Sequence, residues 1–88
     1  MSDNYISALE FKTAIDKITD AQIGKTYIII QARAYGYTPS LVSGAIVINS
    51  KTYQGHPTTA CAGVFIVRAT DTTITMDTGG NPVIYVEI

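Results

Sequence analysis

The stretch CAGVFIVRA, residues Cys61–Ala69, carries apolar side chains at consecutive positions. Successive side chains of a strand point to opposite faces of its sheet, so Phe65 and Val67 would face one way. Val64 and Ile66 would then face the other way. A strand that is apolar on both faces is typical of the centre of a domain or of a contact between subunits. This stretch therefore predicts a strand that is covered on both sides.

Four further segments have the β-branched and aromatic composition of strands. They are TYIIIQAR (Thr26–Arg33), LVSGAIVIN (Leu41–Asn49), TTITM (Thr72–Met76) and PVIYVEI (Pro82–Ile88). In the first, the even positions Ile28, Ile30 and Ala32 form a fully apolar face, which predicts a half-buried strand. DTGGNP, Asp77–Pro82, predicts a hairpin connection, because Gly and Asn tolerate the positive φ of tight turns. Short strands joined by short turns favour antiparallel pairing.

The first part of the chain has a helical pattern. Its apolar positions recur at helical spacing: Ala8, Phe11, Ala14, Ile15 and Ile18. Ser7 and Glu10 fit the Ser-x-x-Glu capping box. The sequence thus predicts a single, mostly β (α+β) domain over residues 1–88. One N-terminal amphipathic helix, about 7–18, precedes a β domain over about 26–88, a small antiparallel β-sandwich or sheet of about five strands.

Charge is distributed unevenly along the chain. Charged residues make up 15% of the sequence and the apolar set 47%, against about 25% charged in a typical domain. Between Ala34 and Val67 the only charged residue is Lys51. Such a segment indicates strands buried on both sides, either in the core of the domain itself or against a partner. Because a small domain has a thin margin of stability, a partner would also stabilise it.

Several classes of function are disfavoured by composition. A net charge of −1 without a basic cluster disfavours nucleic-acid binding and attraction to anionic membranes. The N-terminal MSDNYISALEF lacks the basic start and apolar centre of a signal peptide, and no apolar run reaches the length of a membrane span. The single Cys cannot form an intrachain disulfide. We expect a protein made and kept in a cytoplasm.

The only His and the only Cys, His56 and Cys61, stand five positions apart in YQGHPTTACAG, Tyr53–Gly63. They could form a base and nucleophile pair, but nothing nearby in the sequence would orient the imidazole or lower the pKa of the thiol. We expect Cys61 to be a packing residue and Gly55-His56-Pro57 to be a turn. One chain also lacks the three or four ligands of a zinc site.

Two other motifs have ordinary structural explanations. GKT, Gly24–Thr26, is the tail of a phosphate-binding loop, but Thr19 stands where the earlier Gly is needed, and the motif precedes a strand instead of a helix. Asp71 and Asp77 flank a short strand, where carboxylates usually bond to nearby backbone. The sequence therefore predicts no catalytic residue, no cofactor, no metal and no enzyme.

The layout resembles the small structural proteins of tailed-phage virions, such as head decoration proteins, head-fibre bases and tail components. The resemblance lies in a weakly charged Thr/Tyr/Gly-rich chain with SALEFKTAIDKI first and VIYVEI last. It implies a non-enzymatic subunit that forms a homo-oligomer, often a trimer, and docks on other virion or assembly proteins. It also implies location in the virion after synthesis in the host cytoplasm.

The leading hypothesis is therefore a structural assembly protein with contacts made by tyrosines and aliphatic residues. The candidate interface residues are Tyr35, Tyr37, Leu41, Val42 and Tyr53, together with Tyr5 and Leu9. Tyr is enriched at interfaces because it combines a large contact area with one polar tip. The alternative is a small soluble module that binds carbohydrate or peptide through the same tyrosines. A third hypothesis, a small enzyme using His56 and Cys61, is the least favoured.

Overall fold

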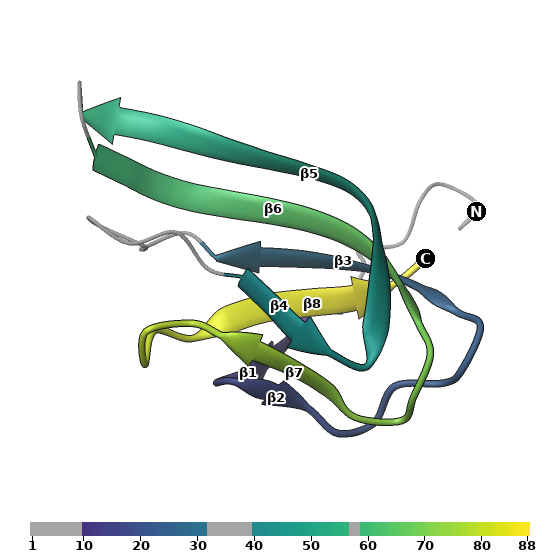
Figure 1. Cartoon of the computed structure of the whole chain (residues 1–88). Helices are drawn as coiled ribbons and strands as arrows, with labels where there is room; N and C mark the ends of the chain where they lie inside the picture. The colour runs from purple at the N-terminus through teal and green to yellow at the C-terminus, as the bar shows by residue number, and fades with distance from the viewer. Residues whose placement is uncertain (1–9, 32–39, 57–58) are drawn as a thin grey trace, which may run out of the picture.

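The structure is a computed structural model that describes residues 10–31, 40–56 and 59–88, with backbone only for 54–56 and 59–61. Its described part contains eight strands and no helix (Figure 1). The strands are β1 (Lys12–Ala14), β2 (Lys17–Ile18), β3 (Thr26–Gln31), β4 (Ser40–Ser43), β5 (Ala45–His56), β6 (Thr59–Ala69), β7 (Ile74–Asp77) and β8 (Val83–Glu87).

The strands form two antiparallel sheets. One has five strands in the order β1-β8-β3-β6-β5, and the other has three in the order β2-β7-β4. The smaller sheet lies against one side of the larger (Figure 1). Two packed antiparallel sheets are compatible with a small β-sandwich, with the core between them.

The predicted N-terminal helix over 7–18 is wrong for its described part, because these residues form β1 and β2. Asp16 lies between these strands with φ 65°, a left-handed conformation that Asp tolerates and that no helix contains. The Asp16 backbone carbonyl accepts a hydrogen bond from Met76 N–H at 2.7 Å. Its side chain accepts one from the Thr78 hydroxyl at 2.6 Å. At this turn the chain passes from the five-stranded to the three-stranded sheet.

The apolar positions of the predicted helix share no buried face. Ile18 is fully buried and Ala14 half-buried, whereas Phe11 and Ile15 are exposed. Helical spacing was present in the sequence, but pairing with β8 and β7 stabilises the extended chain instead. Tertiary pairing commonly overrides a local pattern as short as this one.

The predicted strand Leu41–Asn49 is divided at Gly44, which separates β4 of one sheet from β5 of the other. Gly44 has φ 91°, and a Cβ built there would collide with the backbone of Thr73. Only Gly fits where a positive φ and a close backbone approach coincide. The residue thus allows the chain to change sheets.

The DTGGNP segment is a turn, as predicted, with positive φ at Gly79 and Gly80. The prediction of a hairpin is wrong, because β7 pairs with β2 and β4 whereas β8 pairs with β1 and β3. Local turn chemistry fixes where a chain reverses, and the two sheets decide which strands pair.

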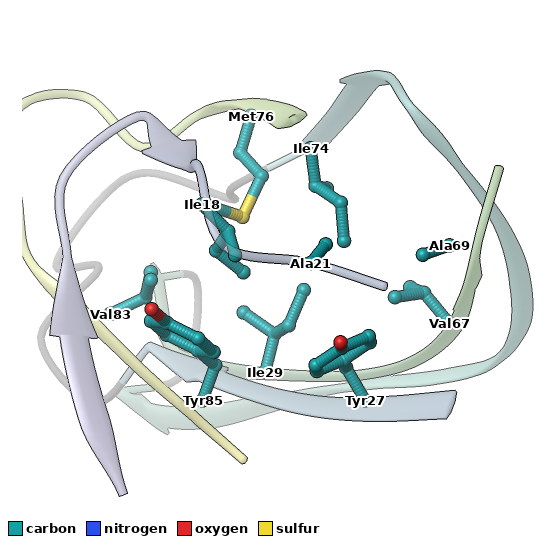
Figure 2. Packing of buried hydrophobic residues seen from close by; sticks show 10 residues of the cluster. All are labelled: Ile18, Ala21, Tyr27, Ile29, Val67, Ala69, Ile74, Met76, Val83 and Tyr85. Carbon is teal, nitrogen blue, oxygen red and sulfur yellow. The ribbon is translucent and has the colours of Figure 1, made fainter. Parts of the chain in front are cut away.

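The core lies on one face of the five-stranded sheet, which we call the core face. Its described residues are Tyr27, Ile29, Gln31, Phe65, Val67, Val83 and Tyr85. Figure 2 shows Tyr27, Ile29 and Tyr85 on the same side of the five-stranded sheet, the side on which Ile18, Ala21 and Met76 lie. On β3 the odd positions therefore face the core, and Ile28 and Ile30 face away.

Gln31 is the polar member of the core face and is 1% exposed. Its Nε2 donates hydrogen bonds to the backbone carbonyls of Thr78 at 3.0 Å and Asn81 at 2.9 Å. These bonds attach the turn before β8 to the end of β3. Two donor contacts to carbonyls also fix the orientation of the amide, since the reverse orientation would place oxygen against oxygen.

Candidate functional site

The opposite side of the five-stranded sheet, which we call the outer face, has an aliphatic centre. This centre consists of six neighbours across β8, β3 and β6: Ile28, Ile30, Val64, Ile66, Ile84 and Val86. Polar residues lie around it on the same side of the sheet, namely Thr13, Thr26 and the exposed Arg68. Ile84 is 39% exposed, Val86 is buried among its neighbours, and the other four are half-buried. The two sheets account for all eight strands of the described residues, so none of these strands is left to cover this face.

Strand β5 forms one edge of the same sheet, beside β6. Ile46, Val47 and Ile48 are exposed by 58%, 42% and 51%, and Tyr53 by 52%. The only charged residue of the strand is Lys51. Its ammonium lies 5.8 Å from the centre of the Tyr53 ring, as in a cation–π contact. An exposed, weakly charged edge of this kind is a template for strand pairing.

A shallow depression of about 270 Å³ lies where β5 meets the outer face. It is lined by Asn49, Ser50, Lys51, Tyr53, Val64 and Ile66. The aliphatic centre and the Lys51–Tyr53 pair at its side give one continuous surface. Such a surface can bury apolar area against a protein or stack an aromatic ring on a ligand.

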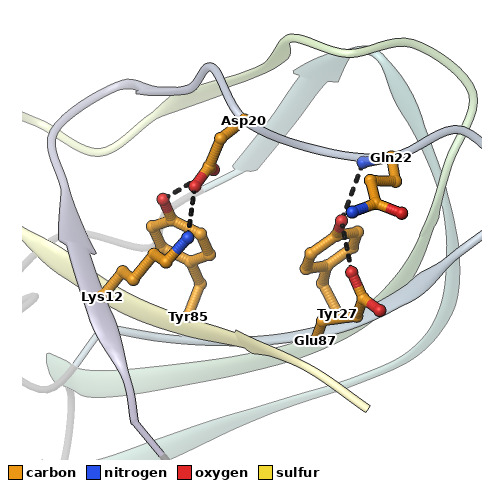
Figure 3. Close-up of polar contacts among 6 residues, drawn as sticks. All are labelled: Lys12, Asp20, Gln22, Tyr27, Tyr85 and Glu87. Atoms are coloured by element: carbon orange, nitrogen blue, oxygen red, sulfur yellow. Dashed lines mark hydrogen bonds and ion pairs between the residues drawn. The ribbon is translucent and has the colours of Figure 1, made fainter.

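A second depression, of about 220 Å³, contains two polar clusters (Figure 3). In one, the Asp20 carboxylate accepts hydrogen bonds from Lys12 Nζ at 2.6 Å and from the Tyr85 hydroxyl at 2.8 Å. In the other, the Tyr27 hydroxyl donates to Glu87 at 3.1 Å and accepts from the Gln22 backbone N–H at 2.8 Å. Both clusters attach the loop before β3 to the core face.

The pKa shifts in these clusters keep the ordinary protonation states at neutral pH. Burial and the hydrogen bond to Asp20 raise the pKa of Tyr85 to about 12. Hydrogen bonds from Lys12 and Tyr85 lower the pKa of Asp20, and the same carboxylate raises the pKa of Lys12. Burial raises the pKa of Tyr27. All four shifts move these groups away from the pKa near 7 that suits a general acid or base.

The predicted interface residues fall into two groups. Tyr5, Leu9, Tyr35 and Tyr37 lie outside the described residues. Leu41, Val42 and Tyr53 are described, and the structure does not bring them onto one strand or sheet. Leu41 and Val42 belong to β4, where Leu41 packs against the core and Val42 is 62% exposed.

Tyr53 belongs to the other sheet, where it lies beside the outer face. Sequence reasoning missed the exposed Ile46–Ile48 run and the aliphatic residues of β8. The available signal was the run of apolar residues in AIVIN (45–49) and in PVIYVEI (82–88).

The hypothetical His56 and Cys61 pair lies on the β5 and β6 backbones, and both side chains are outside the described part. Gly55 and His56 belong to β5, so the predicted turn over Gly55-His56-Pro57 is wrong for its first two residues. Within the described ranges, no group of three His, Cys, Asp or Glu residues could hold a metal ion.

The other motifs have the local roles that were expected. Thr26 begins β3, and the preceding Gly24 N–H donates to the Ala69 carbonyl. The Asp71 carboxylate accepts from Thr72 N–H at 2.7 Å, and the Asp77 carboxylate accepts from Gly79 N–H at 3.3 Å. These are side-chain contacts to nearby backbone of the type that favours turns.

Comparisons with protein-family models, curated proteins and solved structures gave no match. Over the part of the chain that the structure covers, no helix has the length and hydropathy needed to cross a membrane.

Proposed function

We propose that this protein is a non-enzymatic structural subunit that associates with copies of itself and docks on a larger assembly. The observation that carries the proposal is the outer face, six neighbouring aliphatic residues on a sheet whose other face already holds the core. Sheets with one wet face usually alternate apolar and polar side chains. A sheet that is apolar on both faces favours a second covering layer.

The polar clusters are consistent with a structural role. Lys12, Asp20 and Tyr85 bond to one another, and the raised pKa of Tyr85 keeps its phenol protonated at neutral pH. Their hydrogen bonds hold the loop before β3 in place. We therefore assign to these clusters a role in stabilising the subunit.

The proposed setting is a virion of a tailed phage. It rests on the resemblance in composition and on the charge-poor segment, much of which is exposed on β5. The helical start that formed part of that resemblance is replaced by β1 and β2 in the described residues. The proposal of a virion is therefore supported by the β-rich part of the chain.

Light scattering at micromolar concentration tests self-association, with two matched isoleucine substitutions. Ile84→Lys places a charge on the outer face, and Ile23→Lys places one in the loop before β3, where Ile23 is 65% exposed. We expect Ile84→Lys to weaken association by about tenfold or more, since a buried unpaired charge is costly. Ile23→Lys should leave it unchanged. A wild-type chain that stays monomeric and does not co-sediment with any particle would contradict the proposal.

The depression beside Tyr53 favours a second candidate, a small module that binds carbohydrate or peptide. Tyr53 is half exposed there and could stack on a ring of the ligand. This candidate predicts a stable monomer whose tyrosine fluorescence changes on addition of an oligosaccharide or peptide. Tyr53→Ala should abolish that change. Self-association without any such ligand response would leave only the first candidate.

A further inference from the structure

The four edges of the two sheets differ greatly in length. β1, β2 and β4 have three, two and four residues, whereas β5 has twelve. Natural β proteins protect their edges with short strands, lysines and bulges. β1 is short, and its Lys12 is paired with Asp20. Of the described edges, β5 is the one that is both long and almost uncharged.

β5 has two elements of protection, the single Lys51 and irregularities of register. Its register with β6 shifts between Val47 and Asn49 and again beyond Tyr53. Between these irregularities, residues 49–53 pair in regular antiparallel register with β6, and all five are exposed. This regular stretch presents the backbone groups that β6 does not use to the side away from β6. Within it, the Ser50 N–H donates a hydrogen bond to the Asn49 side-chain oxygen at 2.8 Å. The stretch offers room for an added strand.

In the far half of the β5–β6 hairpin, the described residues place no third strand beside β5 or β6. β3 pairs with β6 only as far as Gly63, while β5 and β6 continue to pair as far as His56 and Thr59. The hairpin accordingly projects past β3 in Figure 1. An isolated two-stranded ribbon is marginally stable in water, and a third strand with an apolar face stabilises it. A strand added along β5 would be such a third strand.

We infer that β5 pairs antiparallel with β5 of a second copy of this chain, so that two five-stranded sheets join into one. The inference rests on the proposed assembly function and names its first contact. A twofold contact uses the same patch on both copies. Residues 49–53 are centred on Lys51, so the proposed axis passes through a neighbouring residue of β5, which keeps the two Lys51 side chains from lying directly opposite each other. The joined sheet would also continue the outer face across both copies.

The pair closes on itself. Each copy uses its long edge, and the edges left at both ends of the joined sheet are the three-residue β1 strands. Growth into a fibre would need an open edge that these short strands do not offer. The expected unit is therefore a dimer, or a larger assembly with an even number of copies, which differs from the trimer suggested by the resemblance.

Two threonine substitutions test the inference. Thr52→Lys adds a second cation to the β5 edge, and Thr19→Lys adds one just after β2, where the threonine is also exposed. Native mass spectrometry should show wild-type dimers. Thr52→Lys should weaken dimerisation by about tenfold or more, since like charges placed together at an interface cost several kcal/mol. Thr19→Lys should dimerise like the wild type, and urea unfolding of both variants at low concentration checks that they fold.

Hydrogen exchange gives a second readout that needs no variant. Raising the protein concentration should slow the exchange of β5 amides between residues 45 and 53 and leave β1 amides unchanged. A trimer, or β5 amides that exchange equally fast in monomer and oligomer, would overturn the edge pairing. If Ile84→Lys disrupts the oligomer and Thr52→Lys does not, the assembly function stands and the edge pairing fails. A chain that remains monomeric would contradict both.

Discussion

The two faces of the five-stranded sheet carry similar aliphatic residues but have different neighbours. On the core face, Ile29 is 1% exposed and packs against side chains of the smaller sheet. On the outer face, the adjacent Ile28 is half-buried, and no second sheet of the described residues covers it. The core face also holds Gln31 and the hydroxyl groups of two tyrosines, all hydrogen-bonded to loops.

Apolarity alone therefore does not identify a core. In the described residues, the second sheet covers the face of β3 that carries polar atoms and leaves the more uniformly apolar face uncovered. Polar tips on the core face bond to the loops that close the sandwich, which fixes how the layers fit. In the described residues, the outer face makes no such bonds to loops. This is what we expect of a surface that binds a separate partner.

The largest expected effect comes from removing matched side chains from the two faces. Ile29→Ala leaves a cavity in the core and should lower the free energy of unfolding by about 2 to 5 kcal/mol. Ile28→Ala removes the same atoms from the open face and should cost roughly 1 kcal/mol in the monomer, because less area returns to water. Urea denaturation at low protein concentration measures both. Equal losses would show that the outer face is already covered within one chain.

Gln31→Glu tests the polar contacts of the core face. The carboxylate would stand against the carbonyls of Thr78 and Asn81, which now accept from the Gln31 amide. Loss of both bonds and burial of a charge should cost about 3 kcal/mol or more near neutral pH. Stability should recover partly in acid, where the carboxyl group is protonated and can donate one bond. Gln31→Met is the uncharged control, and a cost as large as that of Glu would contradict the role of charge.

Substitution at Gly44 tests the point where the chain changes sheets. In Gly44→Ala the new Cβ meets the Thr73 backbone at a φ of 91°, so the variant should lose about 2 kcal/mol or more from strain and displaced packing. Gly24→Ala is the matched control, since Gly24 has φ 88° and open space around it. It should lose only about 1 kcal/mol, the cost of the strained φ. Comparable losses would mean that the contact with Thr73 is unimportant.

The smallest effects concern the Tyr85 and Asp20 contact and appear as a dependence on pH. The folded pKa of Tyr85 is raised to about 12 from its usual 10, so its stabilising contribution is complete below pH 10 and declines as the pH rises to about 12. Tyr85→Phe should cost about 1 kcal/mol near neutral pH and flatten that alkaline decline. Absorbance titration of tyrosinate gives a direct check, with Tyr53→Phe as an exposed control.

The Asp20 carboxyl has a lowered pKa in the folded chain, so its contribution is present above the usual Asp range and is lost as the pH falls through the lowered value. Urea midpoints measured in acid should therefore depend less on pH in Asp20→Asn than in the wild type. Identical acid profiles would show that the bonds from Lys12 and Tyr85 do not stabilise the fold.

The sequence was enough to predict most of the strands after residue 26, because β-branched residues and Gly-rich turns act locally. It also indicated that Cys61–Ala69 is apolar on both faces and that Asp71 and Asp77 bond to nearby backbone. It did not predict that β5 continues beyond Asn49 to His56. Three features became clear only from the tertiary structure: the segment Lys12–Ile18 forms two strands, Gly44 separates two sheets, and the odd positions of β3 are the buried ones. All three features depend on pairing with residues far along the chain, such as Ile84 opposite Thr13, and local patterns do not encode such pairing.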